Sequence, residues 1–151
     1  MLKSSLLSSK EIFGALLEIE LKRSLRYQNY LALLLIEARM GSTASREPEN
    51  SNSWSKMLTL VRSVIRETDL IGLPEQNLLT IVLLNSDNRA ASLVADRLSS
   101  WVSQCLGAGG HLSIGGACFP THATDLSGLY QSASGMLAAA RDQRDTCYRI
   151  L

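Results

Sequence analysis

Apolar residues in the first third of the chain recur at helical spacing and then run together. Four of them, at intervals of four positions, predict a helix from about Ser9 to Tyr27: Phe13, Leu17, Leu21 and Leu25. The next segment, Tyr30–Ile36, is continuously apolar rather than alternating, which predicts a central strand covered on both faces. Gly41–Ser53 is polar, contains a proline and predicts an exposed loop.

The middle of the chain predicts a helix followed by a β-hairpin. Helical spacing returns from Trp54 onwards. Two short apolar runs then follow, Asp69–Leu73 and Leu78–Leu84, separated by the polar segment Pro74–Asn77. Two such runs around a polar connection of four residues are typical of a hairpin.

The last third predicts helix, strand, helix and a short final strand. The first of these helices begins at Asp87, and its expected apolar stripe comprises Ala90, Val94, Leu98, Trp101 and Cys105. His111–Phe119 alternates as a strand does, a helix with an apolar face follows around Leu126–Ala140, and residues 146–151 complete the chain. Asp87 and Asp125 stand where helix N-caps are expected.

The order α-β-α-β-β-α-β-α-β predicts an α/β (α+β) fold, with a ferredoxin-like mixed sheet flanked by helices. A length of 151 residues fits a single domain over residues 1–151, within which 41–53 is the expected loop.

Composition narrows the function classes. Hydrophobic residues make up 46% of the chain and charged residues 19%, so we expect a folded core. A net charge of +1 gives no basic surface for nucleic acid, and no apolar run has the length of a membrane span. An odd number of cysteines without metal-ligand spacing indicates buried thiols in a reducing cytoplasm: Cys105, Cys118 and Cys147. His111 and His122 lack suitably spaced partners and are assigned no role.

Several short segments, in this order, resemble the GGDEF family of bacterial diguanylate cyclases. Leu33–Glu37 (LLLIE) is similar to the family's first strand, and Ser113–Ala117 (SIGGA) to a later one. Arg66–Asp69 matches the RxxD motif of the family's inhibitory product-binding site, and five residues separate it from the signature position, as in the family. The opening helix and the segment 137–145 are also similar. The resemblance covers nearly the whole chain and implies a nucleotidyl-cyclase-like fold.

The resemblance also implies that catalysis is lost. The family signature aligns with a degenerate hairpin segment: Glu75, Gln76, Asn77, Leu78 and Leu79. Joining two nucleoside triphosphates requires metal ions held by carboxylates, and glycines that let the backbone approach the nucleotide. Of the expected acids only Glu37 remains, which we interpret as a solvated acid, and Ala140 stands at the position of a phosphate-binding lysine. We therefore expect no catalytic residues, no metal site and no cofactor.

The candidate ligand site comprises Arg66, Asp69 and Arg97. An arginine can bind phosphate or the acceptor edge of guanine, and an aspartate can accept from guanine N–H groups. In family members a second arginine, from the helix after the hairpin, often completes this site across a dimer, and Arg97 falls at that position. The resemblance thus implies that the domain is a cytoplasmic receptor for cyclic di-GMP, with Arg66 and Asp69 close together and exposed. The alternative is a surface ion pair of little energetic value.

Two further hypotheses stay open. The first is that the fold serves as a homodimerisation module or binds a partner signalling protein, because Leu16, Ile19 and Leu21 do not share one narrow face of the first helix. The second is residual nucleotide binding at the former active site, which the lost glycines disfavour. Neither nucleic acid nor direct membrane contact is expected. Family members usually carry further segments, so we expect the chain to be part of a longer signalling protein.

Overall fold

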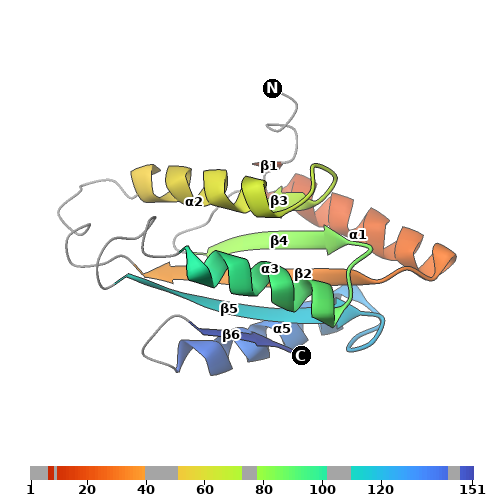
Figure 1. The fold of residues 1–151 in the computed structure, drawn as a ribbon. Coiled ribbons are helices and arrows are strands. Elements are labelled where there is room, and N and C mark those ends of the chain that lie inside the picture. The colour runs from red at the N-terminus through yellow and green to blue at the C-terminus, as the bar shows by residue number, and fades with distance from the viewer. Residues whose placement is uncertain (1–6, 9, 40–50, 73–77, 102–109, 143–146) are drawn as a thin grey trace.

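A computed structural model describes residues 7–8, 10–39, 51–72, 78–101, 110–142 and 147–151. The described strands are β1 (Leu7–Ser8), β2 (Leu31–Arg39), β3 (Leu70–Gly72), β4 (Leu78–Leu84), β5 (His111–Phe119) and β6 (Cys147–Ile150). The described helices are α1 (Lys10–Tyr27), α2 (Ser51–Val64), α3 (Asn88–Ser100) and α5 (Leu126–Arg141). The strands form one mixed sheet in the order β1-β3-β4-β2-β5-β6 (Figure 1).

The centre of the sheet has the predicted ferredoxin-like arrangement. Strand β2 pairs antiparallel with both β4 and β5, and β3 pairs antiparallel with β4. The strands β3-β4-β2-β5 are therefore adjacent in space. In the sequence, α2 lies between β2 and β3, and α3 lies between β4 and β5. The predicted hairpin of β3 and β4 is confirmed, and its connection lies outside the described residues.

Two helical layers cover the sheet, with α2 and α3 on one face and α1 and α5 on the other (Figure 1). Alternate residues of β2 belong to the two cores. Leu34 and Ile36 pack with the residues of α2 and α3, whereas Leu33 and Leu35 pack with those of α1 and α5. This arrangement confirms the prediction from the continuous apolar run, because a strand buried on both faces has no solvent-facing positions.

The sequence prediction differs from the structure at three places. It missed β1, a strand of two residues that pairs parallel with β3. Helix α2 begins at Ser51, inside the segment predicted as a loop. Helix α3 is capped at Trp101, which is exposed instead of lying on a buried stripe, and Cys105 lies outside the described residues.

The buried face of α3 comprises Ala91, Ala95 and Leu98, so the predicted stripe is displaced around the helix. Successive residues of an α-helix are about 100° apart, so Trp101 lies about 60° around the helix from Leu98 and about 120° from Ala95. This position takes Trp101 off the buried face, and its side chain is exposed.

Helix α5 lies in direct contact with the backbone of β5 at Gly115. A Cβ built at this glycine lies 2.1 Å from the backbone nitrogen of Leu137 and 2.6 Å from the carbonyl oxygen of Ala133. No side chain fits there, so a glycine is needed for the helix to approach the strand so closely. This packing positions the C-terminal end of α5 beside the end of β2.

Local polar contacts fix the other helices and turns. The predicted N-caps are confirmed, since Asp87 accepts from the backbone N–H of Ala90 at 3.0 Å and Asp125 from that of Gly128 at 2.8 Å. His122 Nδ1 accepts a hydrogen bond from the backbone N–H of Cys118 at 3.0 Å. None of the described helices combines the length and apolar character needed to cross a membrane.

Candidate functional site

Asp69 joins the turn after α2 to the end of β4. Its Oδ2 accepts a hydrogen bond from the backbone N–H of Arg66 at 2.9 Å, and its Oδ1 accepts one from that of Leu84 at 2.9 Å. The backbone N–H of Asp69 in turn donates to the Arg66 carbonyl at 3.1 Å. The Asp69 carboxylate thus holds the turn after α2 against the end of β4, and both hydrogen bonds are strong because they are charge-assisted.

The expectation that Arg66 and Asp69 are both exposed is wrong for Asp69. The Arg66 side chain is 58% exposed, whereas that of Asp69 is 2% exposed. Burial is tolerated because backbone N–H groups satisfy both carboxylate oxygens. The Arg66 Nε lies 3.7 Å from Asp69 Oδ2, so the two residues form the ion pair considered as the alternative, with the arginine exposed and the aspartate buried.

The guanidinium of Arg66 is held against the turn between β4 and α3. Its Nη2 donates to the carbonyl oxygen of Leu84 and, at 2.9 Å, to Ser86 Oγ. The Ser86 hydroxyl also donates to the Leu84 carbonyl at 3.0 Å. These bonds fix the direction of the side chain, while its exposed part leaves guanidinium donors able to meet a ligand.

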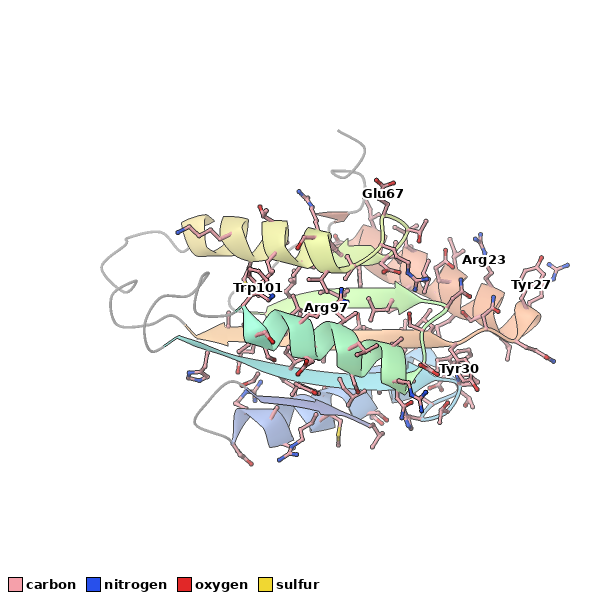
Figure 2. The ribbon with its side chains drawn as sticks, in the orientation of Figure 1. Arg23, Tyr27, Tyr30, Glu67, Arg97 and Trp101 are labelled. Atoms are coloured by element: carbon pink, nitrogen blue, oxygen red, sulfur yellow. The ribbon has the colours of Figure 1, made fainter. Side chains whose placement is uncertain are left out.

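A pocket of about 310 Å³ lies beside this guanidinium, between the end of α2 and the first turns of α3. Arg66, Asp69 and Arg97 all line it, so the structure brings the three predicted site residues together. The other lining residues are Val64, Ile65, Leu83, Asn85, Ser86, Ala90, Leu93 and Val94. Figure 2 shows the Arg97 side chain on the side of α3 that faces α2.

Sequence reasoning missed the contribution of Asn85, Ser86 and Leu93 to the pocket. Asn85 has a φ of 53°, in the left-handed region that asparagine tolerates better than most residues. This conformation turns the chain sharply from β4 into α3. The run Asn85–Asp87 signals a turn in the sequence, but nothing in it indicates that the turn lines a pocket.

The charges around the pocket favour an anion. Arg66 and Arg97 are both exposed, and Asp69, the acid among the described lining residues, already accepts backbone hydrogen bonds. Two guanidinium groups beside apolar walls suit a planar ligand that carries phosphate or several acceptor atoms. Both carboxylate oxygens of Asp69 are engaged by backbone N–H groups, and this carboxylate fixes the turn that carries Arg66.

Within the described residues, the segment that aligns with the cyclase signature is represented by Leu78 and Leu79, at the start of β4, whereas the pocket lies at the other end of this strand. Glu75, Gln76 and Asn77 lie outside the described residues. Leu78 is half-buried and stands opposite Glu37 across the β2–β4 pair, and Leu79 is fully buried in the core. Ser113 of β5 stands opposite Glu37 on its other side.

Glu37 is partly exposed to solvent, and it is also paired with a cation, which the sequence did not predict. Its Oε1 accepts a hydrogen bond from Arg141 Nε at 2.8 Å, and its side chain is 24% exposed. Ala140, at the position of the phosphate-binding lysine, is a fully buried residue of α5. Within the described ranges, no group of three or more His, Cys, Asp or Glu side chains is arranged to hold a metal ion.

No model of a known protein family matches the sequence, and no curated protein is significantly similar to it. Solved structures do match. The GGDEF domain of TpbB (YfiN) from Pseudomonas aeruginosa superposes with a TM-score of 0.83 at 21% identity, over 95% of this chain and 90% of that one. An active GGEEF domain of a diguanylate cyclase from Vibrio cholerae gives a TM-score of 0.79 at 17% identity, over 95% and 98%.

A third similar structure was determined with a ligand. The coiled coil and GGDEF domain of DgcB from Caulobacter crescentus, in complex with cyclic di-GMP, superposes with a TM-score of 0.78 at 10% identity. The match covers 96% of this chain and 82% of that one. The two helical layers, the strand order and these superpositions together show that this chain has the fold of the GGDEF domains of diguanylate cyclases.

Proposed function

We propose that the chain is a catalytically inactive GGDEF-like signalling domain that binds cyclic di-GMP and acts as its receptor in the cytoplasm. The observation that carries the proposal is the convergence of Arg66 and Arg97 on one pocket, with Asp69 fixing the turn that carries Arg66. A GGDEF domain of the same fold, that of DgcB, binds this ligand.

The chemistry of cyclic di-GMP suits the pocket. The ligand carries two anionic phosphodiester groups and two guanines, each with acceptors at O6 and N7. An arginine fork can take either a phosphate or that guanine edge in a bidentate contact. With Arg66 held by Ser86 and the Leu84 carbonyl, little conformational entropy is lost when its remaining donors meet the ligand.

The arrangement around Glu37 supports the absence of catalysis. Arg141 already supplies a positive charge at 2.8 Å from this carboxylate, and the residue opposite on β4 is Leu78. A divalent metal needs several oxygen ligands, so one acid that is neutralised by arginine is a poor metal site. The aligned segment also has Asn77 and Leu78 at the two positions where the family signature has acids.

Calorimetric titration of cyclic di-GMP into the purified chain tests the proposal. We expect saturable binding that falls at least about tenfold in Arg66→Ala, the loss typical of a charged hydrogen bond, and also in Arg97→Ala. The matched control is Arg149→Ala, an exposed arginine on β6 at the other edge of the sheet. Absence of binding by the intact chain, or equal weakening by the control, contradicts receptor function.

Incubation with GTP and Mg²⁺ or Mn²⁺ tests the second half of the proposal. We expect no cyclic di-GMP to form and no metal-dependent binding of GTP. Metal-dependent turnover refutes the claim of inactivity, and GTP binding without turnover favours residual nucleotide recognition.

An exposed apolar row on α1 favours a second candidate function, homodimerisation or binding of a partner signalling protein. Ile12 is 57% exposed and Ile19 is 52% exposed, with the half-buried Leu16 between them, whereas Leu21 lies in the core. An interval of seven residues places Ile12 and Ile19 on one face, as in helices that pair. Sedimentation velocity of the chain and of Ile12→Glu/Ile19→Glu tests it, since a dimer through α1 must dissociate in the variant.

A further inference from the structure

Helix α3 carries an exposed row of three large side chains beside the pocket. Leu93 is 62% exposed, Trp101 is 48% exposed, and Arg97 lies exposed midway between them. Intervals of four residues place the three on one side of the helix, over a length of about 12 Å. In Figure 2 the side chains of Arg97 and Trp101 both lie on the α2 side of α3.

Trp101 is not among the described residues of α3 that are buried in the core. The residues of the helix that pack on the sheet are Ala91, Ala95 and Leu98. Trp101 caps the helix through its backbone N–H, which donates to the Leu98 carbonyl at 3.3 Å, and this contact does not depend on the side chain. About half of the Trp101 side chain is thus exposed next to Arg97, one helical turn beyond the pocket.

The pocket alone is small for a cyclic dinucleotide. Its volume of about 310 Å³ stands at the lower end of the range for sites that enclose a ligand of drug size. One guanine and its phosphate can occupy the space beside Arg66. The second purine then lies outside it, and Trp101 stands one helical turn beyond the lining residue Arg97 along α3.

We infer that Trp101 is a stacking platform for a purine base of the ligand, so that the binding site extends along α3 beyond Arg97. This inference rests on the proposed receptor function. Every nucleobase has a π-face that stacks on an aromatic ring, and a neighbouring arginine adds a contact to the phosphate or the base edge. Leu93, which lines the pocket, supplies an apolar contact to the half of the site beside Arg66, and Arg97 stands between that half and Trp101.

The test is calorimetric titration of cyclic di-GMP into the intact chain and into Trp101→Leu, Trp101→Phe and Arg66→Ala. Stacking predicts that Trp101→Leu weakens binding by about five- to hundredfold, and that Trp101→Phe retains most of the affinity. A second readout is the quenching of Trp101 fluorescence by the ligand in a Trp54→Phe background. Thermal unfolding of each variant verifies folding, because an exposed position tolerates either substitution.

The outcomes separate this inference from the proposed function. If Trp101→Leu binds cyclic di-GMP within twofold of the intact chain while Arg66→Ala loses binding, the receptor function is supported and the stacking role of Trp101 is refuted. Equal loss in Trp101→Leu and Trp101→Phe also overturns it, since phenylalanine preserves an aromatic face. An intact chain that does not bind cyclic di-GMP overturns the receptor proposal itself.

Discussion

Arg141 Nε donates a hydrogen bond to Glu37 Oε1 at 2.8 Å, joining the last turn of α5 to the end of β2 across 104 positions of sequence. The contact depends on the close approach of α5 to β5 at Gly115. It places a protein cation on the acid that the resemblance relates to metal binding in active cyclases. Our proposal that the chain is inactive gains a physical basis in this pair.

The Glu37–Arg141 pair is expected to add little to stability. The two side chains are 24% and 42% exposed, so solvent screens their attraction. Arg141→Gln should lower the free energy of unfolding by no more than about 1 kcal/mol. Urea unfolding measures this change, and a double-mutant cycle with Glu37→Gln isolates the pair from other contacts of Arg141. A coupling energy of several kcal/mol would show that the pair is a structural element of the fold.

Asp69→Asn should be more damaging than its small change in shape suggests. An amide replaces one carboxylate oxygen with an N–H donor, and either orientation then faces a backbone donor at Arg66 or Leu84. We expect a loss of about 1–3 kcal/mol in the free energy of unfolding. Asp96→Asn, at an exposed position of α3, is the matched control and should change stability little.

The same substitution separates two roles for Asp69 in ligand binding. If Asp69 acts by holding Arg66, the Asp69→Asn variant that remains folded should bind cyclic di-GMP more weakly, and lowering the temperature to favour the native turn should recover part of the affinity. Unchanged affinity in the folded variant would show that the position of Arg66 does not depend on this carboxylate.

Gly115→Ala and Gly135→Ala should have opposite effects on stability. The Cβ added at Gly115 meets the backbone of α5 at 2.1 Å, so the helix must move away from the sheet. We expect a loss of about 3 kcal/mol or more, as for severe overpacking. Gly135 is an exposed position within α5 with nothing within 4 Å of its added Cβ, and alanine there should stabilise the helix by roughly 1 kcal/mol. Thermal unfolding of the two variants provides the comparison.

We expect the folded chain to lose stability at alkaline pH because of the buried thiol of Cys118. Burial, and to a smaller degree the charge of Asp87, raises the pKa of its thiol from 9.0 to about 11. Above pH 9 the unfolded chain loses this proton while the folded chain keeps it, so the stabilising contribution is complete below pH 9 and is lost as the pH approaches 11.

The difference in unfolding free energy between the intact chain and Cys118→Ala measures that contribution. Between pH 8 and pH 10.5 we expect the intact chain to lose about 2 kcal/mol more than the variant. Parallel pH profiles for the two proteins would show that the buried thiol titrates as it does in the unfolded chain.

Much of the fold could be predicted from the sequence because its strands are strongly apolar and its helices are well marked. The run Tyr30–Ile36 indicated a strand covered on both faces, and Asp87 and Asp125 marked two helix starts. The two-residue strand β1 could not be predicted, since so short a segment has no periodicity and is defined by its pairing with β3.

The charged residues of the candidate site could be predicted, but not their roles or the other lining residues. The resemblance to the GGDEF family related Arg66, Asp69 and Arg97, and the pocket brings them together. The burial of Asp69 depends on the backbone N–H of Leu84, which is distant in sequence and is placed by the sheet. The exposure of Trp101 likewise depends on which face of α3 meets the core, and the sequence of this helix fits either the predicted stripe through Ala90 and Val94 or the observed face of Ala91 and Ala95.

The most direct test of the receptor proposal is an NMR titration of the isotope-labelled chain with cyclic di-GMP, followed through backbone amide shifts. The account predicts saturable perturbations at Arg66–Asp69, Leu84–Ser86 and Leu93–Trp101, with little change around Glu37 and Ser113. Perturbations confined to the edge around Glu37 and Ser113, or no perturbation at millimolar ligand, would contradict it.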